Sequence, residues 1–179
     1  MKKLFNSEEI NWMFERMAIE ILEKNRGNIN FAIVGIRTRG VYIAQRIKKI
    51  LERISGKILN FGIIDITLYR DDLSIGTHHP EIKSTEIDFN IDNRGIILVD
   101  DVIYTGRTTR ASIDAIFDIG RPKMIQLAVL IDRGHRELPI QPDFVGKYIP
   151  TSRKERIFVR LKEIDNVDEI LIGSVYQDA

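Results

Sequence analysis

The fold predicted for this chain rests on one stretch, which reads Val99-Asp100-Asp101-Val102-Ile103-Tyr104-Thr105-Gly106-Arg107-Thr108-Thr109. Before it, Gly95 to Val99 is a short apolar run, which is typical of a buried strand. After it, Thr108 to Ile119 has apolar residues at helical spacing, and Gly120 and Pro122 end that pattern. The stretch therefore predicts a buried strand that delivers two adjacent carboxylates, followed by a Thr/Gly loop that begins a helix.

This arrangement suits a ribose 5-phosphate. Backbone N–H groups of such a loop, together with the helix N-terminus, form a phosphate cradle. Three threonine hydroxyls add donors, and Gly106 permits a close approach of the backbone. Carboxylates that faced the phosphate would repel it, so Asp100 and Asp101 are expected to accept hydrogen bonds from the two ribose hydroxyls. The alternative is a strand-end turn with two acids and a capped helix. A receiver-domain acidic pair would leave the Thr/Gly loop unexplained.

The rest of the chain predicts an α/β fold. Phe31 to Ile36, Leu59 to Leu68 and Met124 to Ile131 are expected strands, and a tail strand is expected near Ile157 to Leu161. Expected helices begin at Ser7, as N-cap, and at Val41. Continuous apolar strands that alternate with helices favour a parallel sheet covered on both faces, with ligands at the carboxyl ends of the strands.

Three polar segments should meet at that edge. Arg37-Thr38-Arg39-Gly40 follows the first strand, the acidic pair follows the third, and Asp132-Arg133 follows the fourth. Two arginines around a turn suit a second anion, although surface charge is the alternative. Asp132 is a candidate Mg²⁺ ligand or a simple strand-end cap. The polar excursion from Tyr69 to Asp88 is predicted to be a mobile lid or a disordered excursion, and Asp132 to Pro150 is predicted to be irregular.

Four motifs in order resemble the pyrimidine operon regulator family, PyrR, whose members are type I phosphoribosyltransferases. They are Gly35-Ile36-Arg37-Thr38-Arg39-Gly40, Asp65-Ile66-Thr67-Leu68-Tyr69-Arg70-Asp71-Asp72, the stretch from Val99 to Thr109, and Ile131-Asp132-Arg133-Gly134-His135-Arg136-Glu137-Leu138-Pro139. The resemblance ends near Ser152. It implies a mainly parallel sheet flanked by helices, a small hood, one domain over residues 1–179, and a loop over about 69–88 that closes on the site.

The resemblance also implies a reaction, which is transfer of a ribosyl 5-phosphate from 5-phosphoribosyl-1-diphosphate (PRPP) to N1 of uracil, with Mg²⁺ and release of pyrophosphate. The implied catalytic residues are Asp100, Asp101, Arg39 and Arg70. Those for the 5-phosphate are Thr105, Gly106, Arg107, Thr108 and Thr109. Those for pyrophosphate are Thr38, Arg39 and Gly40. The hood and base pocket cover about 132–150 plus the tail, and include Asp132, Arg133 and Gly134.

Tyr104 bears on the choice of base. Purine enzymes that resemble this motif place an aspartate there, and a tyrosine, with an ordinary pKa near 10, is a poor substitute at neutral pH. Uracil is therefore favoured, and a purine phosphoribosyltransferase is the alternative. A third possibility is a non-catalytic sensor of UMP or UTP.

The resemblance implies a second function, which is regulation of pyrimidine operons through binding of leader mRNA. The formal net charge is only +1, so any RNA contact should be local. Candidate RNA-binding residues are Lys24, Arg26, Arg153, Lys154 and Arg156, and a solvated edge is the alternative. The chain has no cysteine, no apolar run of membrane length and no signal peptide, so a cytoplasmic protein is expected. The amphipathic first helix is core or interface, and a homodimer or larger homo-oligomer is expected.

Overall fold

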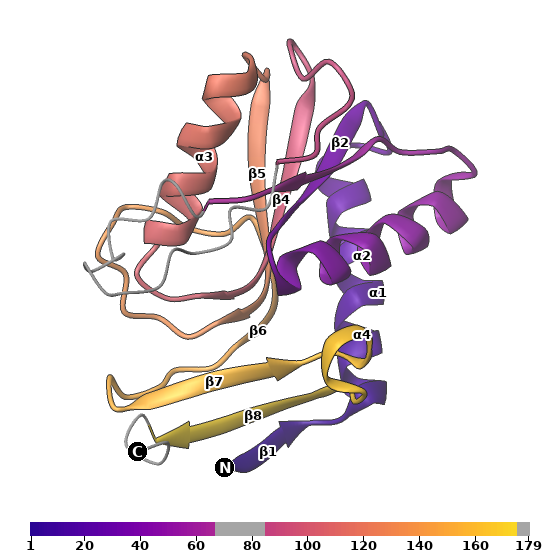
Figure 1. Cartoon of the computed structure of the whole chain (residues 1–179). Helices are drawn as coiled ribbons and strands as arrows, with labels where there is room; N and C mark the ends of the chain where they lie inside the picture. The colour runs from indigo at the N-terminus through magenta and orange to yellow at the C-terminus, as the bar shows by residue number, and fades with distance from the viewer. Residues whose placement is uncertain (67–84, 175–179) are drawn as a thin grey trace.

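The computed structural model describes residues 1–66 and 85–174, and their strands form two sheets (Figure 1). The larger sheet is entirely parallel and has the order β3-β2-β4-β5-β6. Its strands are β2 (Phe31–Ile36), β3 (Phe61–Ile64), β4 (Gly95–Ile103), β5 (Met124–Asp132) and β6 (Phe144–Tyr148). The smaller sheet is antiparallel, in the order β1-β8-β7.

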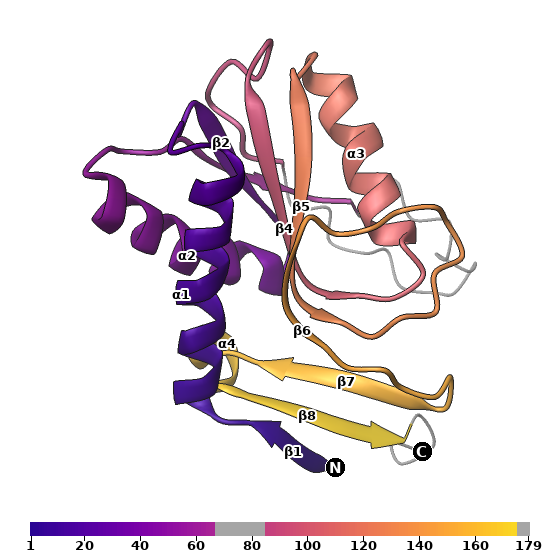
Figure 2. The same cartoon turned by 180° about the vertical axis from the view of Figure 1, so that it is seen from behind.

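Helices cover both faces of the large sheet, as Figures 1 and 2 show. The helices α1 (Ser7–Lys24) and α2 (Arg39–Ser55) lie on one face, and α3 (Arg107–Ile119) lies on the other. Alternate residues of β4 supply the two cores, since Ile97 and Val99 pack toward α1 and α2 while Ile96 and Leu98 pack toward α3. The continuous apolar strands thus follow from burial on both faces.

The small sheet, which we call the hood, joins the two ends of the described chain. It consists of β1 (Lys2–Phe5), β7 (Glu155–Arg160), β8 (Glu169–Ser174) and the short helix α4 (Lys162–Asp165). Residues 132–150, which were expected in the hood together with the tail, contribute no strand to it. The tail strand expected near Ile157 to Leu161 is confirmed as β7. β1 and β8 were not predicted, because their pairing joins segments about 170 residues apart and leaves no local signal.

Arg46 of α2 fastens the hood to the rest of the fold. Its guanidinium donates to Glu163 Oε2 at 2.6 Å and to Asp168 Oδ1 at 2.7 Å, and it lies over the ring of Phe14. Burial opposes the charge, but the hydrogen bonds to the two carboxylates outweigh it and raise the pKa of Arg46. The hood therefore sits on α2 through a shared, half-buried ion cluster.

Several predicted boundaries were wrong. The first helix is capped by Asn6, not Ser7, since the Asn6 side chain accepts from Glu9 N and Glu9 Oε2 accepts from Asn6 N. The described part of the expected strand from Leu59 to Leu68 contains only the four residues of β3. The region from 132 to 150 is not wholly irregular, because β6 extends the large sheet within it.

The apolar stripe of α1, which was either core or interface, is core. Its residues are buried within this one chain, namely Ile10, Met13, Phe14, Met17 and Ile21. The opposite face of the helix exposes two large apolar side chains, Trp12 at 62% and Ile19 at 54%. No helix of the described ranges has the length and hydropathy needed to span a membrane.

Candidate active site

The two carboxylates lie inside β4, not after its end as predicted. Asp100 pairs with Val129 in the parallel register, and the ladder continues to Ile103 opposite Asp132. Asp100 is 7% exposed, and its Oδ1 accepts from Asp101 N at 2.9 Å, while Asp101 Oδ1 accepts from Val102 N at the same distance. The sheet itself thus holds both acids rigidly at its carboxyl edge.

Burial makes it unfavourable for both carboxylates of this pair to be charged. Desolvation raises the pKa of Asp100 well above its ordinary value, and repulsion from Asp101 raises it further. Desolvation also raises the pKa of Asp101, while the hydrogen bond with Asp100 and the charge of Arg39 oppose the shift. Such a site favours a ligand that brings hydroxyl donors or a cation.

The Thr/Gly loop follows the acids and opens α3. Gly106 is the N-cap with a φ of +92°, a conformation that glycine adopts without strain, and no side chain caps the helix. Thr105 and Thr108 are half-buried, whereas Thr109 is only 2% exposed. Arg107 is exposed and pairs with Glu137 at 3.0 Å. The uncapped N–H groups at this helix start are what a phosphate would require.

The turn before α2 lies beside the acids. The peptide bond between Arg37 and Thr38 is cis, and Thr38 is an N-cap without a side-chain hydrogen bond. A side chain at Gly40 would lie 2.5 Å from Val99 O, so glycine lets the start of α2 pack directly on β4. Both helices that begin at the site lack a side-chain cap, while α1, which begins elsewhere, has a full capping box.

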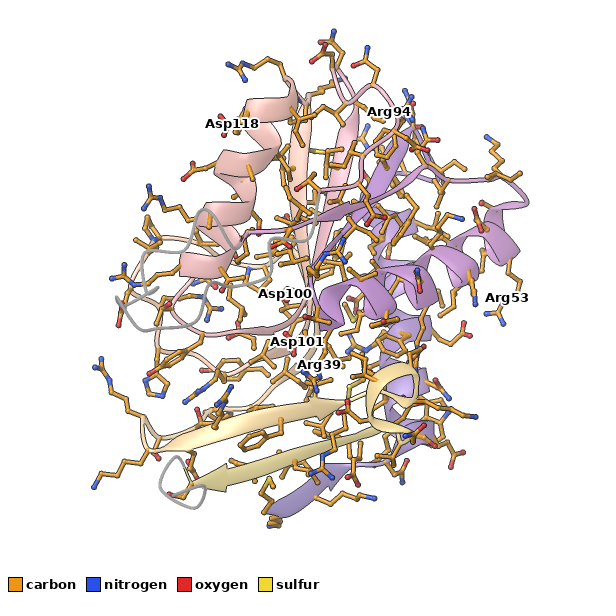
Figure 3. All side chains as sticks on the ribbon, in the orientation of Figure 1. Arg39, Arg53, Arg94, Asp100, Asp101 and Asp118 are labelled. Atoms are coloured by element: carbon orange, nitrogen blue, oxygen red, sulfur yellow. The ribbon has the colours of Figure 1, made fainter. Side chains whose placement is uncertain are left out.

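Arg39 links the acids to the hood. Its Nη2 donates to Asp165 Oδ1 at 3.1 Å and Oδ2 at 3.2 Å, and its Nε is buried without a hydrogen-bond partner among the described residues. Figure 3 shows Arg39 next to Asp101, between the large sheet and the hood. Sequence reasoning missed Asp165, because nothing local relates it to a residue 126 positions earlier.

A cavity of about 580 Å³ brings the two acids and the Thr/Gly loop together, whereas Thr38, Arg39 and Gly40 are not part of its lining. Its lining includes both acids and every residue from Val102 to Ala111, and the hood contributes Arg156 and Ile157. Arg133 and Tyr104 also line it, with the guanidinium 4.0 Å from the ring centroid. Most of the residues expected at the site therefore share one space.

Other predicted site residues lie differently. The carboxylate of Asp132 accepts from Arg136 Nη2 at 2.5 Å and from Gly134 N at 2.9 Å, and it does not line the cavity. Arg136 was not predicted as its partner, because the two residues lie at a strand end and in the loop after it, where a spacing of four residues carries no helical signal. Arg70 and most of the proposed lid lie outside the described residues.

The candidate RNA-binding residues are not gathered on one surface. Lys24 pairs with Asp143 at 2.6 Å, next to the amino end of β6, and Arg26 follows just after α1. Arg153 and Lys154 are exposed in the turn before β7, and Arg156 lines the cavity at the carboxyl end of the large sheet. Only the second group adjoins the candidate active site.

The described residues contain no cluster of three or more His, Cys, Asp or Glu side chains fit to hold a metal ion. The two buried carboxylates nevertheless repel one another, and a bound cation would relieve this repulsion. Mg²⁺ commonly takes one or two carboxylates and fills its remaining positions with water and substrate phosphate oxygens. The residues present therefore fit a Mg²⁺ ion that arrives with a phosphorylated substrate.

Comparisons with known proteins found matches over most of the chain. The family model of the phosphoribosyl transferase domain matches residues 2–159. A bifunctional protein PyrR from Caldicellulosiruptor bescii is 55% identical over 171 residues, covering 96% of this chain and 94% of the relative. One of the same name from Acetivibrio thermocellus is 58% identical over 160 residues, covering 89% and 87%.

Solved structures share the architecture at low identity. The hypoxanthine phosphoribosyltransferase of Trypanosoma cruzi superposes with a TM-score of 0.73 at 17% identity, covering 97% of both chains. A hypoxanthine-guanine phosphoribosyltransferase from Bacillus anthracis gives 0.71 at 20% identity, covering 98% of both. This likeness confirms the predicted fold class.

Proposed function

Because this chain belongs to the PyrR family of phosphoribosyltransferases, we propose that it converts uracil and PRPP to UMP and pyrophosphate and also regulates pyrimidine operons by binding leader mRNA. The observation that carries the enzymatic part is the shared cavity of the acidic pair and the uncapped start of α3. These groups suit the ribose hydroxyls and the 5-phosphate of one molecule.

Each group has a defined task in this proposal. Asp100 and Asp101 accept hydrogen bonds from the ribose hydroxyls and favour the positive charge that develops on the ribose as the bond to pyrophosphate breaks. Thr105 and the N–H groups that begin α3 hold the 5-phosphate. Arg39 and the turn at Thr38 hold pyrophosphate. Mg²⁺ would neutralise the leaving pyrophosphate when it is bound.

The base subsite is proposed at the end of the cavity lined by Tyr104, Arg133, Arg156 and Ile157. The ring of Tyr104 is covered by the Arg133 guanidinium and meets the His135 ring edge-on at 5.9 Å between centroids. A tyrosine held in this way offers no carboxylate to a purine ring nitrogen, which favours uracil. Asp132 stays a less supported metal ligand, since both of its oxygens already accept hydrogen bonds.

The test of the enzymatic part is to incubate the protein with PRPP, Mg²⁺ and uracil, and to measure UMP and pyrophosphate. Hypoxanthine and guanine are assayed in parallel. We expect turnover with uracil, and an Asp101→Asn variant that folds normally but loses most of it. Asp114→Asn, a surface change on α3, is the matched control. Preference for a purine, or full activity of the Asp101→Asn variant, would refute the assignment.

The regulatory part is supported by the turn before β7. Arg153 and Lys154 are exposed there, while Arg156 lines the cavity. A uridine nucleotide in the cavity would contact the same segment that presents the cations, which supports RNA binding that depends on UMP or UTP. Lys24 has less support, because it is paired with Asp143.

The regulatory test compares a pyrimidine-operon leader RNA with a scrambled RNA of the same composition, with and without UMP. We expect preference for the leader, enhancement by UMP and a steep dependence on salt. Arg153→Gln together with Lys154→Gln should weaken leader binding without loss of uracil transfer. Equal affinity for both RNAs would remove the regulatory assignment and leave the enzymatic one.

The exposed Trp12 and Ile19 of α1 support a homo-oligomer, and analytical ultracentrifugation tests it.

A further inference from the structure

Arg133 is a buried cation, and its hydrogen-bond partners among the described residues are neutral. It is 7% exposed, its Nε donates to Thr151 Oγ1 at 3.0 Å, and its Nη2 donates to the backbone oxygens of Ser152 at 3.2 Å and Glu155 at 2.5 Å. It forms no ion pair with the residues that the structure describes. Burial lowers the pKa of Arg133, and the nearby charge of Arg156 lowers it further, while the charge of Glu155 acts in the opposite direction. Burying such a cation lowers the stability of the fold, which indicates that its contacts have a role other than stabilising the protein.

The three oxygens belong to one turn, residues 151–155, which leads into β7. The turn also has internal bonds, from Ser152 N to Glu155 Oε2 at 2.7 Å and from Glu155 N to Ser152 O at 3.2 Å. Arg133 therefore ties the turn to the end of β5, where its own backbone N donates to Ile103 O. The next two residues after the turn, Arg156 and Ile157, form part of the cavity wall. Their placement depends on where the turn is held.

The same guanidinium also contacts Tyr104, on the opposite wall of the cavity. Its central carbon lies 4.0 Å from the centroid of the Tyr104 ring, close enough for a favourable cation–π contact. Tyr104 is further held by its backbone oxygen, which accepts from Arg136 Nη1 at 3.0 Å. One side chain thus contacts both the loop after β4 and the turn before β7. Its planar fork suits this double role, because it stacks and donates at once.

We propose that Arg133 is the positioning residue of the base subsite: it fastens the 151–155 turn to Tyr104 and so sets the width available to a single-ring base. This inference rests on the proposed function and deepens it. Arg133 does not need to touch the base. Its donors on Nε and Nη2 are already used by the turn, and its face is used by Tyr104.

The test replaces Arg133 by lysine and measures KM for uracil and for PRPP separately. Lysine keeps the charge but cannot stack or reach all three oxygens together. We expect KM for uracil to rise about tenfold, as for loss of about one hydrogen bond to a charged group. KM for PRPP should change less than about twofold, because its subsite lies at the acids and the α3 start. Tyr104→Leu should also raise KM for uracil. In the double variant, KM for uracil should rise by much less than the product of the two single-variant rises, because both changes remove the same contact.

Arg121→Lys is the matched control. Arg121 also donates to two backbone oxygens, of Phe117 and Gly120, and lies over the Phe117 ring, but it sits at the far end of α3. Unchanged KM for uracil in Arg133→Lys would overturn this inference alone. A parallel rise of both KM values with a lowered Tm would show a structural role only and would also overturn it. A wild-type protein that transfers nothing to uracil would overturn the proposed function and this inference together.

Discussion

Replacing Asp100 by asparagine is expected to stabilise the fold at neutral pH while it removes transfer activity. Asp100 is buried beside Asp101, and burial followed by this repulsion raises the pKa of Asp100 well above its ordinary value. The folded state therefore favours the protonated form of Asp100 over the charged carboxylate. Asparagine keeps the oxygen that accepts from Asp101 N and has no charge. The variant thus removes the penalty and retains the hydrogen bond.

The size of the gain follows from the charges. Two unit charges about 4 Å apart repel by about 4 kcal/mol at an effective dielectric constant near 20. Because the charge of Arg39 offsets part of this effect on Asp101, we expect the free energy of unfolding to rise by about 1 to 2 kcal/mol at neutral pH. For a domain of this size that is roughly 2 to 8 °C in Tm.

The pH dependence has a definite sign. A carboxyl group whose pKa is raised by folding holds its proton longer in the folded state, so wild-type stability falls as pH rises above about 4, the ordinary value for aspartate. The penalty is complete once pH exceeds the raised pKa of Asp100. The advantage of Asp100→Asn should therefore be small near pH 4.5 and should increase as pH rises to 7.5.

Denaturant unfolding at fixed protein concentration, at pH 4.5, 6.0 and 7.5, measures this difference. Asp114→Asn serves as control, since Asp114 is half exposed and pairs with Arg110 at 3.3 Å on the surface of α3. We expect the control to change stability by less than about 0.5 kcal/mol at each pH. An Asp100→Asn protein that is less stable than wild type at pH 7.5, or a gain that does not vary with pH, would refute the reasoning.

Three further outcomes are expected. Arg46→Gln should lower the free energy of unfolding by about 2 kcal/mol at pH 7, because Arg46 lowers the pKa of Glu163 and of Asp168. This loss of stability should become smaller as pH falls below about 4, where both acids take up protons. Asn6→Ala should cost about 1 kcal/mol, since it removes the side-chain half of the capping box with Glu9, and thermal unfolding measures both changes. Chelation of Mg²⁺ by EDTA should abolish uracil transfer, and added Mg²⁺ should restore it; transfer that persists in EDTA would remove the metal from the proposal.

Much of this protein was predictable from local sequence. Except for β6, which lies in a region predicted to be irregular, the strands and helices of the large sheet followed from short apolar runs, helical spacing and glycine stops. These patterns reflect burial of each segment on its own. The Thr/Gly loop was identifiable since its parts are contiguous, so the chain brings them together without help from other elements. The family resemblance, which the comparisons confirm, rested on the same contiguous motifs.

The remaining features depend on contacts between distant segments. β1 pairs with β8, Arg39 binds Asp165, and Arg133 holds the turn that begins at Thr151. A single sequence gives no periodic or local signal for such contacts, because each partner would be equally plausible as a solvated surface residue. The sequence by itself determined the chemistry that the site can hold. Only the tertiary structure decided which side chains surround it, because that depends on how the hood folds back over the carboxyl edge of the sheet.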